Sequence, residues 1–148
     1  MFVEEDYMND LLDIQHIAFE LASEKYALKI SDVYEIIRLQ QISPTHNSKF
    51  FLEGVINLRG KVIPVVNLHK RFKLIECART KETRIIVVKS REEMIGIIVD
   101  KVDSVIQFND IQPTPKVVAG IDGEYFEGIG ITENGVISLL KIDIVLHD

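Results

Sequence analysis

The sequence predicts a mainly β protein made of two small five-stranded barrels packed side by side, with a few short helices. Three observations support this fold class. The chain of 148 residues is 47% hydrophobic and 27% charged, which is typical of a folded globular protein. Isoleucine and valine number 22 and 15 against 12 leucines, and β-branched side chains favour strands. Apolar side chains alternate with polar ones along short stretches, and the pattern of these stretches occurs twice.

Residues 1–13 carry five acidic side chains and no basic one. This segment is therefore expected to be a flexible acidic tail, loose at least as far as Asn9. Residues 14–148 are expected to form a single domain in which two β-barrel subdomains are intertwined.

Strands and turns follow in order along this domain. The expected strands are 17–21, 26–30, 36–39, both arms of a hairpin over 54–66, 83–89, 94–99, 102–108, 128–132 and 136–140. Gly60 and the Asn134-Gly135 pair suit hairpin turns. Pro64 has no amide hydrogen, which predicts a local edge or a bulge. Pro113 and Pro115 break the chain.

Three short helical segments and two polar loops complete the expected elements. Ser31 can cap a helical turn, Asn67 can cap a helix through Phe72, and residues 141–146 form a terminal helix. Residues 40–49 and 73–82 are polar and are expected to be loops.

The two halves of the chain resemble each other. A shift of 69 residues places 26–33 over 95–102, so that Val33 matches Val102. A shift of 74 residues places 62–66 over 136–140. Each copy of about 60–70 residues is too short to bury much core alone, so the two copies should pack together. Small closed barrels suit such strands because closure removes exposed edges.

Charge and cysteine content restrict the class of protein. The net charge of −6 and a pI of about 5.2 argue against a nucleic-acid partner. A single cysteine, Cys77, cannot form an internal disulfide and fits a reducing compartment. The N-terminus is not a signal peptide, and no apolar run reaches the roughly 18 residues of a membrane span. A cytoplasmic protein without membrane insertion is expected.

Neither a catalytic site nor a metal or cofactor site is expected. The four histidines are His16, His46, His69 and His147. Their spacing, alone or with Cys77, matches no metal-binding motif. The sequence contains no nucleophile elbow, P-loop or dinucleotide-binding motif. Gly128 and Gly130 lie in a hairpin pattern, which indicates close strand packing rather than a phosphate-binding loop. The chain is therefore expected not to be an enzyme.

Glu35 and Arg59 are the two charges of interest, because each lies at the end of a turn among apolar strands. They are either two solvated turn charges or a positioned pair on a recognition surface. Arginine suits the second role because its planar fork can bind a carboxylate or a carbonyl.

Two segments of the sequence resemble the CheW family of bacterial chemotaxis coupling proteins. They are YALKISDVYEIIR over 26–38 and FLEGVINLRGKVIPVVNL over 51–68. The stretch GVINLRGKVIPV is the most specific, and residues 96–102 and 125–130 agree with it. Asn67 departs from the family, which more often has Asp there, and residues 44–48 lack a second proline.

The resemblance implies two SH3-like barrels and an adaptor without catalytic activity or cofactor. Its expected partners are the cytoplasmic tips of methyl-accepting chemotaxis receptors and the regulatory domain of the histidine kinase CheA, met in membrane-associated receptor arrays. Receptor binding or coupling is assigned by resemblance to Val33, Glu35, Asn57, Arg59, Gly60 and Val102. Kinase binding is assigned to Ile36 and Ile42, although either residue could instead belong to the core.

Three alternatives remain open on the sequence. The chain could serve as a CheW-like adaptor in another chemosensory pathway, such as surface motility. An enzyme hidden in a small barrel would need an acid/base or nucleophile set. An SH3-like or OB-like nucleic-acid module would need a basic face rich in aromatic residues, which the negative charge and the absence of tryptophan oppose.

Overall fold

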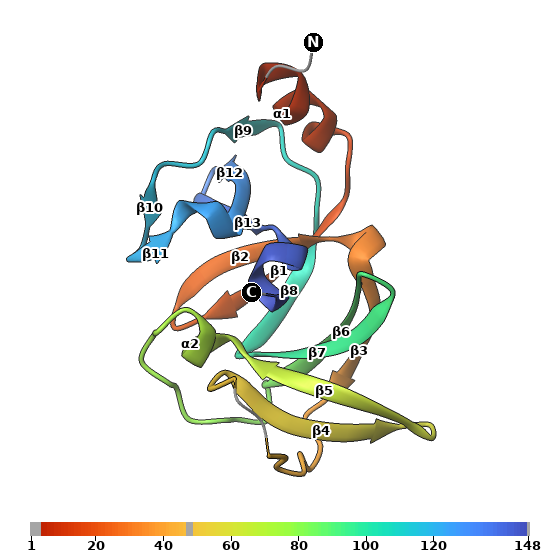
Figure 1. Cartoon of the computed structure of the whole chain (residues 1–148). Helices are drawn as coiled ribbons and strands as arrows, with labels where there is room; N and C mark the ends of the chain where they lie inside the picture. The colour runs from red at the N-terminus through yellow and green to blue at the C-terminus, as the bar shows by residue number, and fades with distance from the viewer. Residues whose placement is uncertain (1–3, 47–48, 148) are drawn as a thin grey trace.

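The computed structural model describes residues 4–46 and 49–147, and its main strands form two sheets (Figure 1). Sheet A has the strand order β8-β1-β2-β13-β12-β9. Its strands are β1 (His16–Leu21), β2 (Glu24–Lys29), β8 (Lys101–Ile106), β9 (Asp110–Gln112), β12 (Phe126–Thr132) and β13 (Gly135–Leu140). Sheet B has the order β3-β6-β7-β5-β4. Its strands are β3 (Val33–Arg38), β4 (Leu52–Leu58), β5 (Lys61–Asn67), β6 (Arg84–Ser90) and β7 (Glu93–Val99).

The remaining elements are short. They are the helices α1 (Glu4–Leu12), α2 (Leu68–Arg71) and α3 (Ile142–Leu146), the 3-10 turns η1 (Ile30–Asp32) and η2 (Gly123–Tyr125), and the small β10 (Val117–Val118) and β11 (Ile121–Asp122) ladder. The prediction of a mainly β fold with two β subdomains and a C-terminal helix is confirmed. Sheet A has a sixth strand, β9, which escaped prediction because it is only three residues long.

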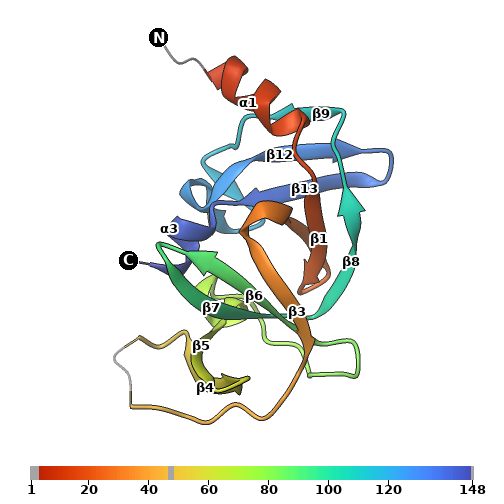
Figure 2. The ribbon, with the colours of Figure 1, turned by 90° about the vertical axis from the view of Figure 1, so that its right-hand side faces the viewer.

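Each sheet contains strands from both halves of the chain. In sheet A, β1 and β2 from the first half pair with β8 and β13 from the second. In sheet B, β6 and β7 from the second half pair with β3 and β5 from the first. The chain passes from sheet A to sheet B after β2, and Figure 2 shows β3 continuing from this point into sheet B. The two spatial subdomains therefore differ from the two sequence repeats, which exchange strands.

The repeat itself is visible in the pairing of equivalent strands. β2 and β13 are parallel, with Ala27 beside Leu139, and β7 and β5 are parallel, with Gly96 beside Val65. The 69-residue shift relates Ala27 to Gly96, and the 74-residue shift relates Val65 to Leu139. The same parallel pairing of equivalent strands therefore occurs once in each sheet.

Three clusters of buried hydrophobic side chains form the core around these sheets. The central cluster joins both sheets, and its members include Phe19, Tyr26, Leu28, Val66, Ile86 and Ile97. The sheet A cluster includes Ala18, Ala27, Ile137 and Leu139, together with Met8 and Leu11 of α1. The sheet B cluster is formed by Ile56, Ile63, Val65, Ile85, Val87 and Ile98. Because strands expose alternate side chains to opposite faces, β6 contributes Ile86 to the central cluster and Ile85 to the sheet B cluster.

The N-terminal segment differs from the expected loose tail. Residues Glu4–Leu12 form α1, which lies beside β9 (Figure 1). Met8 and Leu11 are buried in the sheet A cluster, and Tyr7 and Leu12 pack against it. These apolar residues recur at helical spacing, so burial of one helix face orders a segment whose acidic charge suggested solvation.

Local chemistry explains three smaller features. The side chain of Asn67 accepts a hydrogen bond from Lys70 N and caps α2, as predicted. Pro64 lies in β5 before the parallel pairing with β7 begins at Val65, so the missing amide falls on a locally unpaired side of the strand. A Cβ at Gly130 would lie 2.4 Å from the Phe108 ring, which agrees with close strand packing.

The helices among the described residues are all too short, or too polar, to cross a membrane.

Candidate functional site

Glu35 and Arg59 form an ion pair on the surface of sheet B. Arg59 Nη1 donates to Glu35 Oε2 at 3.2 Å, and Nη2 donates to Oε1. Glu35 comes from β3, and Arg59 comes from the turn between β4 and β5. β3 and β4 are the two edge strands of sheet B. The two side chains are therefore paired with each other, and both remain partly exposed to solvent.

The turn that carries Arg59 has an uncommon backbone conformation. Arg59 and Gly60 have φ values of +50° and +85°, and Leu58 pairs with Lys61 across the turn. Two central residues with positive φ define the type I′ hairpin turn, whose twist matches that of the strands. Asn57 Oδ1 accepts a hydrogen bond from Gly60 N at 2.9 Å, which fixes the turn.

Each side chain of the pair shifts the pKa of the other, although both are partly exposed. The hydrogen bond and charge of Arg59 lower the pKa of Glu35, while Glu35 and, secondarily, Tyr34 raise the pKa of Arg59. The Arg59 side chain is 62% exposed and that of Glu35 is 30% exposed. Exposed ion pairs contribute little to stability because water screens them. The arrangement is suited to presenting a bidentate guanidinium–carboxylate unit to a partner.

A small hollow lies beside the pair. It has a volume of about 170 Å³ and is lined by Tyr34, Leu58, Arg59, Lys61, Ile63 and Met94. The Tyr34 side chain is among the exposed large apolar groups, with 55% relative exposure. Sequence reasoning missed Tyr34, whose place beside Arg59 follows from the pairing of distant strands.

Val33 and Val102 lie at the junction between the two sheets. Both are partly buried and pack against the central cluster. Val33 begins β3 in sheet B, and Val102 pairs with Phe19 in sheet A. The structure thus places the repeat-equivalent valines against one shared core, at the positions where the chain crosses between sheets.

Ile36 and Ile42 lie on different sides of sheet B. Ile36 pairs with Ile86, a member of the central cluster, but remains 36% exposed at the sheet edge. Ile42 packs against the sheet B cluster. A shared flat surface containing both isoleucines is therefore not formed, and Ile42 is largely a core contact.

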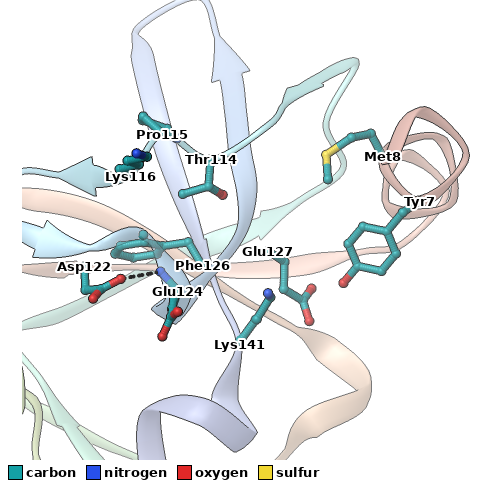
Figure 3. Close-up of a pocket in the computed structure, with 11 residues that line it drawn as sticks. Tyr7, Met8, Thr114, Pro115, Lys116, Asp122, Glu124, Phe126, Glu127 and Lys141 are labelled. Atoms are coloured by element: carbon teal, nitrogen blue, oxygen red, sulfur yellow. Dashed lines mark hydrogen bonds between the residues drawn. The ribbon is translucent and has the colours of Figure 1, made fainter. Parts of the chain in front are cut away.

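A cavity of about 1050 Å³ lies elsewhere, lined by α1, the segment 114–124 and residues of sheet A (Figure 3). Figure 3 shows Tyr7 on α1 facing Glu127 and Lys141. Glu127 pairs with Lys29 at 3.3 Å, and burial raises the pKa of its carboxyl. Burial and then the charge of Glu127 raise the pKa of Tyr7 to about 12. None of the expected site residues lines this cavity.

One group of side chains converges in a way that the sequence spacing did not suggest. Donor atoms of His69, Cys77 and Asp100 all lie within 4.8 Å of one another. The sequence showed no histidine at metal-ligand spacing from Cys77, because seven residues lie between His69 and Cys77 and Asp100 lies much further along the chain. Folding of the loop onto α2 brings the three donors together.

Comparisons with known proteins agree on one family. The CheW-like domain model matches residues 15–148. The chemotaxis protein CheW of Treponema pallidum is 33% identical over 136 residues, covering 88% of this chain and 79% of the relative. The crystal structure of the scaffolding protein TtCheW from Thermoanaerobacter tengcongensis superposes with a TM-score of 0.84 and 37% identity, covering 91% of this chain and 88% of that chain.

A partial match extends to a kinase. The chemotaxis protein CheA of Bacillus subtilis is 32% identical over 90 residues, which cover 59% of this chain and 13% of CheA. The matched family model covers nearly the whole chain, and the solved relative has the same fold. The chain therefore belongs to the CheW-like family of chemotaxis proteins.

Proposed function

We propose that this chain is a non-enzymatic scaffold of bacterial chemotaxis that couples methyl-accepting chemoreceptors to the histidine kinase CheA. The observation that carries the proposal is the match to a scaffolding CheW, with a TM-score of 0.84 over 91% of this chain. The relatives are named for chemotaxis, which favours this pathway over another chemosensory pathway such as surface motility. The coupling takes place in the cytoplasm, at membrane-associated receptor arrays.

The Glu35–Arg59 pair is the proposed centre of the coupling surface. It is exposed, its geometry is bidentate, and Asn57 and Gly60 hold its turn. A guanidinium in this position can exchange part of its bonding to Glu35 for a carbonyl or carboxylate of the partner. Arginine and tyrosine side chains such as Arg59 and Tyr34 are also frequent energetic centres of interfaces.

Val33 and Val102 are proposed to line the receptor-binding region at the junction of the sheets. Each is only partly buried against the central cluster, so each leaves apolar surface near the start of its strand, Val33 in β3 and Val102 in β8. An amphipathic helix such as a receptor tip can bind an apolar surface of this kind.

The kinase is proposed to bind the edge of sheet B through its regulatory domain. Ile36 is the better candidate because it is exposed on edge strand β3, and Ile42 acts by supporting the sheet from the sheet B cluster. The 90-residue similarity to CheA supports an association between like domains.

The test reconstitutes the wild-type chain with CheA and receptor signalling fragments and measures co-sedimentation and kinase output. Arg59→Ala and Glu35→Ala should each weaken coupling about five- to tenfold, a loss equal to about 1 kcal/mol or more. Lys81→Ala is the control, because Lys81 is an exposed lysine of the loop 73–82 and lies outside the pair and its hollow.

Two outcomes would contradict parts of this proposal. Normal coupling by both alanine variants would restrict the Glu35–Arg59 pair to a structural role. Failure of the wild-type chain to bind the regulatory domain of any CheA would reject the chemotaxis function itself.

A further inference from the structure

Three potential metal ligands from separate segments meet beside α2. His69 belongs to α2, Cys77 to the loop 73–82, and Asp100 to the corner between β7 and β8. Their donor atoms lie within 4.8 Å of one another, and His69 Nε2 lies 3.1 Å from Asp100 Oδ2. The three donors are a ring nitrogen, a sulfur and a carboxylate oxygen.

The His69 and Asp100 donors are held in place by the fold. His69 is only 5% exposed, so its ring has little freedom to turn away. Asp100 Oδ2 accepts a hydrogen bond from Ala22 N at 2.8 Å, and this amide belongs to the turn between β1 and β2. Hydrogen bonds from other residues to a ligand side chain, such as this one, orient metal ligands in proteins.

The loop that carries Cys77 is anchored on both sides of the thiol. Asn67 Nδ2 donates to Glu76 Oε1 at 2.8 Å, and Arg79 Nη2 donates to Glu53 Oε1 at 2.6 Å. Cys77 itself is exposed, and its sulfur lies within 4.8 Å of the His69 and Asp100 donor atoms. The thiol is therefore kept near the other two donors while an ion can still reach it.

The donor set and spacing fit a borderline-soft divalent ion. Zinc binds imidazole nitrogen and carboxylate oxygen at about 2.0–2.2 Å and thiolate at about 2.3 Å, in a tetrahedron. Adjacent N and O ligands are then about 3.3 Å apart, close to the 3.1 Å found here. A divalent cation would also be balanced by one thiolate and one carboxylate, so no net charge would be left at the junction.

We propose that His69, Cys77 and Asp100 form a binding site for a divalent ion of the zinc class, with water as the fourth ligand. Binding forms the metal–Nε2, metal–Sγ and metal–Oδ2 bonds. The thiol proton leaves to solvent, and the neutral imidazole shifts its proton from Nε2, where it bonds to Asp100 Oδ2, to Nδ1, so that Nε2 is free to bind the ion. Asp100 bonds to the β1–β2 turn of sheet A, whereas His69 follows β5 of sheet B. The ion would tie the loop 73–82 to the junction of the two sheets.

The test uses the untagged full chain and Co²⁺ as a spectroscopic probe, followed by competition with Zn²⁺. Wild-type protein should bind one equivalent and show a thiolate-to-cobalt charge-transfer band, which zinc removes. Zinc should also raise the midpoint of thermal unfolding, because the folded state binds it preferentially. Cys77→Ser alters an exposed side chain and should abolish the band and weaken metal binding at least about tenfold.

Two further variants complete the experiment. Asp100→Asn keeps an acceptor for Ala22 N but removes the anionic ligand, and it should also weaken binding. His46→Gln removes an exposed histidine of the loop 40–49 and should leave binding unchanged. Absence of the charge-transfer band in folded wild-type protein would overturn the proposal. So would equally tight binding by Cys77→Ser, since the three side chains would then form only a hydrogen-bonded group.

Discussion

Arg59 has a left-handed backbone conformation that side chains other than glycine seldom adopt, with φ of +50°. In this conformation its guanidinium reaches Glu35 on the opposite edge strand of sheet B. A left-handed residue is disfavoured by about 1 kcal/mol or more, and an exposed ion pair offsets little of this. The hairpin turn accounts for this conformation, because Ala22 and Ser23, and also Arg91 and Glu92, have positive φ in their own turns.

The titration of Glu35 tests this pairing at the residue scale. Arg59 lowers the pKa of Glu35 below the usual 4.5. For a lowered carboxyl pKa, the stabilisation by the pair is present above the unfolded-state pKa and is lost as pH falls through the folded-state pKa. A carbon NMR titration should give a Glu35 midpoint below 4.5 in the wild type.

Arg59→Ala should move that midpoint back up toward the usual value, and Lys81→Ala should leave it in place. A Glu35 midpoint that does not respond to Arg59→Ala would show that the two side chains do not pair in solution.

At the scale of elements, α1 is the feature that most changes the picture drawn from the sequence. Its acidic composition suggested a solvated tail, yet Met8 and Leu11 are buried against sheet A. The helix lies outside the matched CheW-like domain, which begins at residue 15. It therefore adds a cover to the sheet A cluster and one wall to the large cavity.

Leu11→Ala tests whether this cover is formed. Leu11 is 1% exposed, and truncation of a buried leucine costs about 2–3 kcal/mol or more. Chemical denaturation should show a loss of this size, at the lower end because α1 can partly detach. Asp10→Ala, at an exposed neighbouring position, should change stability by less than about 0.5 kcal/mol. Equal and negligible effects of both variants would restore the loose tail.

Strand periodicity was the strongest part of the sequence analysis, whereas contacts between distant segments were not visible in it. Alternating apolar residues located the strands 17–21 and 26–30 and the hairpin over 54–66. Asn67 correctly marked the start of α2. β3 begins three residues before the predicted strand because a bulge between Val33 and Glu35 breaks the alternation. The meeting of His69, Cys77 and Asp100 depends on tertiary folding, and no local pattern encodes it. Glu35 and Arg59 already stood out as charges among apolar strands, whereas the proposed coupling role of these and the other site residues rests on family resemblance.

At the scale of the whole molecule, the exchange of strands makes the two halves depend on each other. Sheet A lacks its β8, β9, β12 and β13 without the second half, and sheet B lacks β6 and β7. The central cluster also draws on both sheets. We therefore expect the chain to unfold in one cooperative transition.

Splitting the chain within the loop 73–82 tests this dependence. Fragments 1–78 and 79–148 should each lack the circular dichroism of a folded β protein, because neither can complete a sheet. Mixing them at equal concentration should restore the signal. A fragment that folds alone with a cooperative transition would contradict the interdependence of the halves.

The same exchange of strands determines the order in which the protein can fold during synthesis. All five strands of sheet B lie between residues 33 and 99, so that sheet can close while the C-terminal third is still inside the ribosome. β1 and β2 precede sheet B in the chain, but β13 can pair with β2 only after residue 140 has been made. Until then the face that carries Ala18 and Ala27 lacks its partners Ile137 and Leu139, a situation that favours aggregation. β1 and β2 are therefore the strands that a nascent-chain chaperone would protect longest.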